Sequence, residues 1–213
     1  MKRTLASLAF ALAFGLAAQA MAQAPAAPQG PRAAIAGQVT AWDGKTLTMK
    51  TKVGGETVKI AIMDNANVSV LTKATLADIK PNDYIASAGK KNADGTLSAY
   101  DIRILPESFR GRIDTFSPYP AGGTSTEMSN TMTNATIDAI VAQSADGKTL
   151  KVKYKDGEQT IVVTPQTAVM RQDSGKMDDV KVGANVSVAS VKTDAGFVGT
   201  RVAVGKDGAV PPI

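Results

Sequence analysis

The chain has 213 residues and a formal net charge of +5, and it contains no His and no Cys. Without these two residue types the common zinc sites and the usual nucleophile–base pairs of enzymes are absent, and no disulfide can form. The mild positive charge is far from the basic stripe expected of a nucleic-acid-binding protein. We therefore expect stability to come from apolar cores, and nucleic acid is not an expected partner.

Residues 1–22 are typical of a secretory signal peptide. They begin with two basic residues after Met1, continue with a short apolar run, and end on Ala20-Met21-Ala22, a small-residue pattern that signal peptidase reads. The apolar run is too short for a membrane-spanning helix, which needs about 20 residues. The sequence predicts cleavage between Ala22 and Gln23 and a periplasmic or secreted mature protein without a membrane span.

The mature chain contains an internal repeat. The pentapeptide Asp43–Leu47 recurs identically as Asp146–Leu150, and five further segments correspond in the same order. Six ordered correspondences indicate two copies of one structural unit. The expected organisation is a signal peptide (1–22), a disordered Ala/Pro-rich segment (23–33), the first repeat (34–105), a connector (106–133), the second repeat (134–205) and a tail (206–213).

Within each repeat, apolar and polar residues alternate with the period of a half-buried β-strand. Asp-Gly dipeptides such as Asp43-Gly44 separate the strands and are typical of tight hairpin turns. A helical turn is expected near 75–79, with a counterpart near 176–180. The residues predicted to be buried are Val39, Leu47, Val58, Ile60 and Ile102 in the first repeat, and Ile137, Leu150, Val152, Ile161 and Val202 in the second.

Each repeat therefore reads as three strands, a helical turn and two more strands. This order favours an all-β protein of two tandem small β-barrels, OB-like with five strands each, because closing the sheet removes its exposed edges. An SH3-like or six-stranded barrel is the alternative topology.

Three segments of the first repeat carry a resemblance to a known family. The runs Gly37-x-Val39-Thr40-Ala41, Asp43-Gly44-x-Thr46-Leu47-Thr48 and Leu76-x-Asp78-Ile79-Lys80-Pro81-x-Asp83 resemble a repeat domain of unknown function found in exported bacterial proteins. The resemblance implies export and an OB-like barrel, and it implies no catalytic residue. Some relatives are automatically labelled as permeases for metal uptake, but this chain lacks the several spanning segments that a permease needs.

No enzyme is expected from the residues present. The sequence has no P-loop, GxSxG or GxGxxG pattern, and the Asp residues that precede Gly read as turn residues rather than as general acids. We accordingly expect no catalytic residue and no cofactor.

The connector holds the strongest candidate for a partner-binding site. It is rich in Pro, Gly, Ser and Thr, yet it contains Phe109, Phe116 and Tyr119, and Arg110 and Arg112 lie between the two phenylalanines. Aromatic and Arg residues together are favoured at interface hot spots. The alternative is a solvated loop whose rings are anchored on an adjacent barrel.

Two methionines, Met128 and Met132, are a second and weaker candidate. Thioethers bind Cu(I) outside the cytoplasm, although ordinary packing also explains methionines at this spacing. The leading hypothesis is a non-enzymatic binding protein that contacts an envelope protein or polysaccharide. The alternative is a small-ligand or metal-handling accessory protein.

Overall fold

The structure, a computed structural model, describes residues 28–112, 114–118, 130–144 and 146–212. The signal peptide, Tyr119 and Met128 therefore lie outside the described residues. What is described is all-β, with three single turns of 3-10 helix. Within these ranges no helix is long and apolar enough to cross a membrane.

The first repeat supplies six strands and one 3-10 turn. They are β1 (Arg32–Trp42), β2 (Thr46–Thr51), β3 (Thr57–Lys73), η1 (Leu76–Asp78), β4 (Tyr84–Lys91), β5 (Leu97–Ala99) and β6 (Asp101–Leu105). The connector contains η2 (Glu107–Phe109) and β7 (Thr115–Pro118). From the second repeat and the residues just before it come β8 (Asn130–Ser144), β9 (Gly147–Tyr154), β10 (Gly157–Val163), β11 (Ala168–Ser174), η4 (Met177–Asp179), β12 (Asn185–Thr193) and β13 (Gly196–Gly205).

Local sequence explains where these strands begin and end. At the turn between β1 and β2, the Asp43 carboxylate accepts the backbone N–H groups of Lys45 at 2.8 Å and Thr46 at 2.6 Å. Gly44 follows with φ of 92°, a conformation that disfavours any residue with a Cβ. The predicted helical turns are confirmed as η1 and η4, each followed by a strand.

The first closed set of strands, which we call ring A, is a five-stranded barrel. Strand β1 pairs antiparallel with β2 and with β12, and β2 pairs antiparallel with β3. The antiparallel pair β12–β13 then returns to β3, alongside which β13 runs parallel. Ring A therefore consists of β1, β2, β3, β13 and β12.

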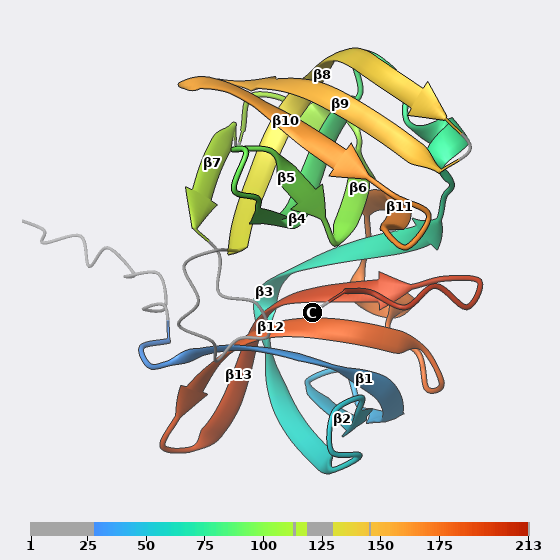
Figure 1. Cartoon of the computed structure of the whole chain (residues 1–213). Helices are drawn as coiled ribbons and strands as arrows, with labels where there is room; N and C mark the ends of the chain where they lie inside the picture. The colour runs from blue at the N-terminus through green and yellow to red at the C-terminus, as the bar shows by residue number, and fades with distance from the viewer. Residues whose placement is uncertain (1–27, 113, 119–129, 145, 213) are drawn as a thin grey trace, which may run out of the picture.

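A second closed set, ring B, has the same order of pairings. Strand β8 pairs antiparallel with β9 and with β4, and β9 pairs antiparallel with β10. Strand β5 pairs antiparallel with β4 and parallel with β10. Figure 1 shows the strands of ring B above those of ring A, with β3 reaching from one to the other.

The two repeats exchange strands, which corrects the expectation that each forms its own barrel. Ring A combines the first three strands of the repeat 34–105 with the last two of 134–205, and ring B combines the complementary halves. Hydrophobic alternation states which face of a strand is buried, but it does not state which copy supplies the neighbour. Because both copies carry the same pattern, either pairing buries the same apolar residues.

A local twofold relation links the two halves. The C-terminal part of β3 pairs antiparallel with β11, and Leu71 lies opposite Gln172, its own counterpart in the second repeat. Each ring packs around its own core, and each core draws residues from both repeats. Of the residues predicted to be buried, nine are buried, and Val58 is partly buried against the core of ring A.

The predicted ends of the repeat region need adjustment. Strand β1 begins at Arg32, inside the segment 23–33 that was expected to be disordered. The tail is also anchored, because the Lys206 N–H donates to the Leu71 carbonyl at 2.9 Å, and the buried Ala209 accepts a hydrogen bond from the Asn185 amide at 3.4 Å.

Candidate functional site

The aromatic residues of the connector are attached to ring B. Strand β7 pairs antiparallel with β8, and Phe116 lies opposite Thr133. The Phe116 ring packs against the core of ring B and stacks on Tyr154, with 5.8 Å between ring centroids. This contact makes β7 an added strand of ring B.

Arg110 fastens the connector to the same ring. Its guanidinium donates to the carbonyl oxygen of Asn82 at 2.7 Å and to the hydroxyl of Thr136 at 2.6 Å. It also lies over the Tyr84 ring, 5.6 Å from the centroid, and forms an ion pair with Glu107. The hydrogen bond that Arg110 donates to the Glu107 carboxylate raises the pKa of Arg110 further, so the side chain is a fixed cation.

The predicted partner-binding residues thus divide into two groups. Phe109, Arg110 and Phe116 are half-buried on ring B, whereas Arg112 is exposed, with its guanidinium 6.0 Å from the centre of the Phe109 ring. Tyr119 lies outside the described residues. The connector therefore closes a position on ring B, and Arg112 is the member of the set left facing solvent.

Met132, the described member of the methionine pair, lies on β8 beside an ion pair between the buried Asp101 and the partly buried Arg103. Its sulfur accepts a hydrogen bond from Arg103 at 3.5 Å, and the Arg103 Nε is 3.3 Å from the Oδ1 of Asp101. Burial raises the pKa of Asp101, and the nearby Arg103 charge opposes that rise. No group of three or more acidic residues that suits a metal ion occurs among the described residues.

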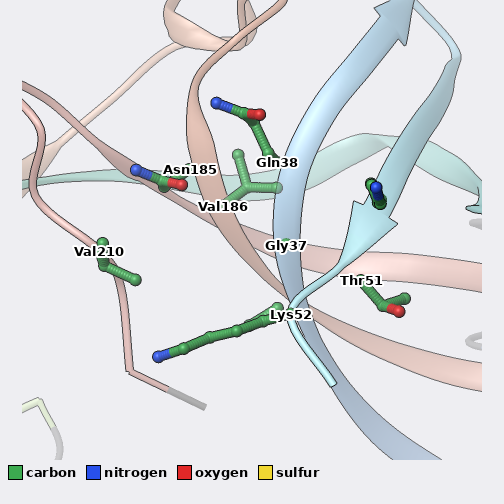
Figure 2. A pocket seen from close by; sticks show the side chains of 9 residues that line it. Gly37, Gln38, Thr51, Lys52, Asn185, Val186 and Val210 are labelled. Atoms are coloured by element: carbon green, nitrogen blue, oxygen red, sulfur yellow. The ribbon is translucent and has the colours of Figure 1, made fainter. Parts of the chain in front are cut away.

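Ring A carries a groove of about 340 Å³. Figure 2 shows that its lining comes from four separate segments: the middle of β1, the end of β2, the start of β12, and the tail. The side chains of Lys52 and Val210 approach it from opposite sides (Figure 2). Its lining residues are Ala36, Gly37, Gln38, Lys50, Thr51, Lys52, Asn185, Val186 and Val210.

The groove of ring A and the Arg110 site of ring B occupy equivalent positions. Arg110 and Val210 follow the last strand of their repeats by the same number of residues. The turn before each is the same: the Phe109 N–H donates to the Pro106 carbonyl at 2.9 Å, and the Ala209 N–H donates to the Lys206 carbonyl at 2.8 Å. By this correspondence Val210 replaces Arg110, and Asn185 replaces Tyr84, since both residues open their strands. The two large side chains that fill ring B are therefore absent from the groove.

The backbone on one wall of the two sites is conserved in shape. Asn82 and Gly183 are equivalent turn residues with φ of 68° and 87°. The Asn82 carbonyl accepts from Arg110, whereas the Gly183 carbonyl accepts from the Gln38 amide at 3.0 Å. In ring A this carbonyl is therefore hydrogen-bonded by Gln38, at the rim of the groove.

Two lysines lie at the edge of the groove. Lys50 and Lys52 are exposed at its edge, and neither takes part in an ion pair with the described residues. In ring B the counterpart of Lys50 is Lys153, which pairs with Asp138 at 2.9 Å, and this carboxylate raises the pKa of Lys153. The groove therefore offers two ammonium groups to an acidic ligand.

Sequence reasoning did not find this groove. Its lining residues are dispersed over the chain, and none belongs to a recognisable motif. One signal was present: the repeat alignment places the small residue Thr51 opposite Tyr154, and it continues into the tail, where Val210 faces Arg110. Positions at which two copies of one unit differ in side-chain volume are where a cavity is expected.

Comparison with known proteins finds a family model that matches part of the chain. Residues 136–203 match the family model described as a domain of unknown function (DUF5666). No curated protein and no solved structure matches the chain. The match supports the resemblance seen in the sequence, and it identifies the second repeat as similar to a family of domains whose function is unknown.

Proposed function

We propose that the protein is an exported, non-enzymatic binding protein whose two rings are OB-type barrels, and that the groove of ring A is its binding site. The strand order supports the barrel type. In both rings the third strand of one repeat lies parallel to a strand from the end of the other repeat, β3 to β13 in ring A and β10 to β5 in ring B, as the Greek-key closure of a five-stranded OB barrel requires.

One observation carries the choice of site. Ring B fills the position with Arg110 and Tyr84 from its own chain, whereas ring A leaves the same position as a groove. A ligand that enters ring A takes the place that a side chain of this protein holds in ring B. The lysine pair Lys50 and Lys52 favours an acidic group in that ligand.

The site has few of the features that chemistry would need. Its ionisable groups are two lysines, and its polar side chains Gln38 and Asn185 each donate to a backbone carbonyl at the rim. Such an arrangement orients a ligand and supplies no acid–base pair. For the alternative, a copper-handling role, Met132 offers a sulfur that already accepts from Arg103.

The proposal is tested by closing the groove with the residues that close ring B. The double variant Asn185→Tyr with Val210→Arg introduces both side chains into ring A. We expect the wild-type chain to retain a component of a native envelope extract, protein or polysaccharide, and the double variant to lose it.

The matched control is Val141→Arg, which adds the same charge at a valine that is 57% exposed on ring B. Circular dichroism and thermal unfolding establish that all three chains fold. Equal retention by the wild-type chain and the groove-filled variant would contradict the proposal, as would loss of the component from Val141→Arg.

A further inference from the structure

Two backbone hydrogen bonds define which residues of β1 face β12. The Pro31 carbonyl accepts from Lys192 at 2.9 Å, and the Val39 N–H donates to Ala184 at 2.9 Å. Because the groups of an antiparallel strand alternate in direction, the odd-numbered residues between them face β12. Arg32, Ala34 and Ala36 therefore direct their backbone N–H and C=O groups to the opposite edge.

On that opposite edge the pairing of β1 with β2 ends at Ala36. The Ala36 carbonyl accepts from the Lys52 N–H at 2.8 Å, which is the last backbone bond on this side. Within the described residues, no strand pairs with Arg32–Ile35 here, and β12 is their only strand neighbour. The backbone of Ala34 thus presents a donor and an acceptor next to the groove.

Ring B shows what covers the equivalent edge. Asn82 donates to the Ile137 carbonyl at 2.8 Å, so the odd-numbered residues of β8 face β4 and the even-numbered ones face β7. Strand β7 fills that edge, with Thr115 opposite Asn134 and Ser117 opposite Met132. Asn134 and Met132 are the counterparts of Ala36 and Ala34.

The registers of the two rings agree at this place. Thr133 pairs with Ser87 in ring B, and Ile35 pairs with Val188 in ring A. The side chain opposite Thr133 is Phe116, which packs on the ring B core. Ile35 is itself partly buried against the ring A core, so a strand added here would set an apolar side chain over that core.

We propose that ring A binds an extended segment of a partner protein, which adds antiparallel to the free edge of β1 in the place that β7 holds in ring B. This inference rests on the proposed function and names its ligand class. The N–H and C=O groups of Ala34 bond the added strand, as in other strand additions to a sheet edge, whereas the Ala36 carbonyl already accepts from Lys52. The segment carries an apolar or aromatic residue opposite Ile35.

The charge pattern of the segment follows from the groove. In ring B, Asp114 precedes β7, and its charge contributes to raising the pKa of Arg110. In ring A the corresponding residue of an added strand lies on the side of Lys52, whose backbone ends the β1–β2 pairing. An acidic residue two positions before the apolar one therefore completes the ligand.

A synthetic peptide with the sequence of residues 114–118, Asp-Thr-Phe-Ser-Pro, is the probe. Binding to the intact mature chain is followed by fluorescence anisotropy, and amide shifts of Ala34 and Ala36 by nuclear magnetic resonance. N-methylation of the Ser nitrogen should weaken binding at least roughly tenfold, because this N–H faces Ala34. N-methylation of the Phe nitrogen, which faces away from β1, should leave binding unchanged.

Variants of the protein test the same edge from the other side. Ala34→Pro removes the N–H and should weaken peptide binding to the same extent, and the variant should fold because proline is tolerated at a sheet edge. Ala34→Ser keeps the N–H and should bind the peptide normally. If Ala34→Pro fails to fold, the N-methylated peptides still test whether the peptide bonds to the backbone of Ala34.

Two results would overturn the inference. One is absence of peptide binding while the groove-filled variant still loses its envelope component, which leaves the proposed function standing alone. The other is concentration-dependent dimerisation that Ala34→Pro abolishes, because it assigns the edge to a second copy of this chain.

Discussion

Rings A and B have the same strand order, yet they are closed in different ways. In ring B the connector covers the site: β7 pairs with the edge of β8, and Arg110 lies over Tyr84. Ring A has Val210 and Asn185 at these positions, with a groove beside them, and no other described strand pairs with the neighbouring edge of β1. Since the fold is common to both rings, the difference arises from a few side chains and one short strand.

The filled site of ring B supports the proposal that the groove of ring A binds a ligand. An isolated groove on a small barrel is weak support for a binding site, because shallow grooves are common. A groove that the sister ring fills with specific contacts is stronger, because the filled copy shows which groups the position accepts. In ring B these are a cation, an aromatic ring and an added strand.

The largest expected effect comes from the equivalent core residues Ile60 and Ile161, each fully buried in its ring. Replacing either with Ala should cost about 2–5 kcal/mol of unfolding free energy, as large-to-small core changes do. Because each repeat supplies strands to both rings, both variants should unfold in a single transition. Urea denaturation followed by circular dichroism measures the cost and the number of transitions.

Two separate transitions in either variant would contradict this coupling. They would mean that ring A and ring B are independent folding units despite the exchange. A matched control is Val53→Ala, since Val53 is 76% exposed and its truncation should leave the unfolding midpoint nearly unchanged.

The sequence predicted strands and cores well because the information is local. Alternation along β2 and β9 identifies the inward residues, and Asp43 with Gly44 specifies the turn. The exchange was not predictable in this way. Ile137 of the second repeat packs in one core with Ile85 of the first, and the pattern around each is equally compatible with a neighbour from its own copy.

The site was predicted only in part, for a similar reason. The concentration of Phe109, Arg110 and Phe116 in the connector pointed to a structured segment, and that segment is docked. Their partners Tyr84 and Tyr154 are distant in sequence and carry no motif. The groove depends on Val210, in a segment expected to be a simple tail.

The exchange itself can be fixed covalently, because the chain has no cysteine of its own. Ala34 of the first repeat lies opposite Ala189 of the second across the β1–β12 pair. The variant with Ala34→Cys and Ala189→Cys should form an intramolecular disulfide and gain about 2–4 kcal/mol of unfolding free energy. Mass spectrometry of the monomer and denaturation with and without reductant give the two readouts.

Tandem barrels without exchange would place these two residues in different domains. Absence of the disulfide in a folded monomer would then contradict the exchanged arrangement. The single variant Ala34→Cys is the control for the effect of the substitution itself, and it should differ little from the wild-type chain in stability.

The smallest expected effect concerns the carboxylates that cap η1 and η4. Asp78 and Asp179 are equivalent residues of η1 and η4, and each carboxylate accepts the backbone N–H of the residue three positions earlier at 2.8 Å. The Thr75 hydroxyl and N–H lower the pKa of Asp78, whereas the Lys176 N–H and the Lys206 ammonium lower the pKa of Asp179.

A lowered pKa in the folded state means that the ionised carboxylate stabilises the fold. That stabilisation is present above the ordinary pKa of aspartate and is lost as the pH falls through the lowered value. Asp78→Asn and Asp179→Asn should therefore lower the thermal midpoint by a few degrees at neutral pH and lower it less in acid. Scanning calorimetry across this pH range follows both variants.

Salt distinguishes the two positions. Asp179 has an ion pair with Lys206 at 3.0 Å, whereas the leading partners of Asp78 are the neutral groups of Thr75. Mobile ions screen an exposed ion pair more than a short hydrogen bond to a neutral donor. The loss caused by Asp179→Asn should therefore shrink in concentrated salt, while the loss caused by Asp78→Asn should persist. Equal salt dependence of the two losses would show that Lys206 contributes nothing, and that ring A and ring B cap this turn in the same way.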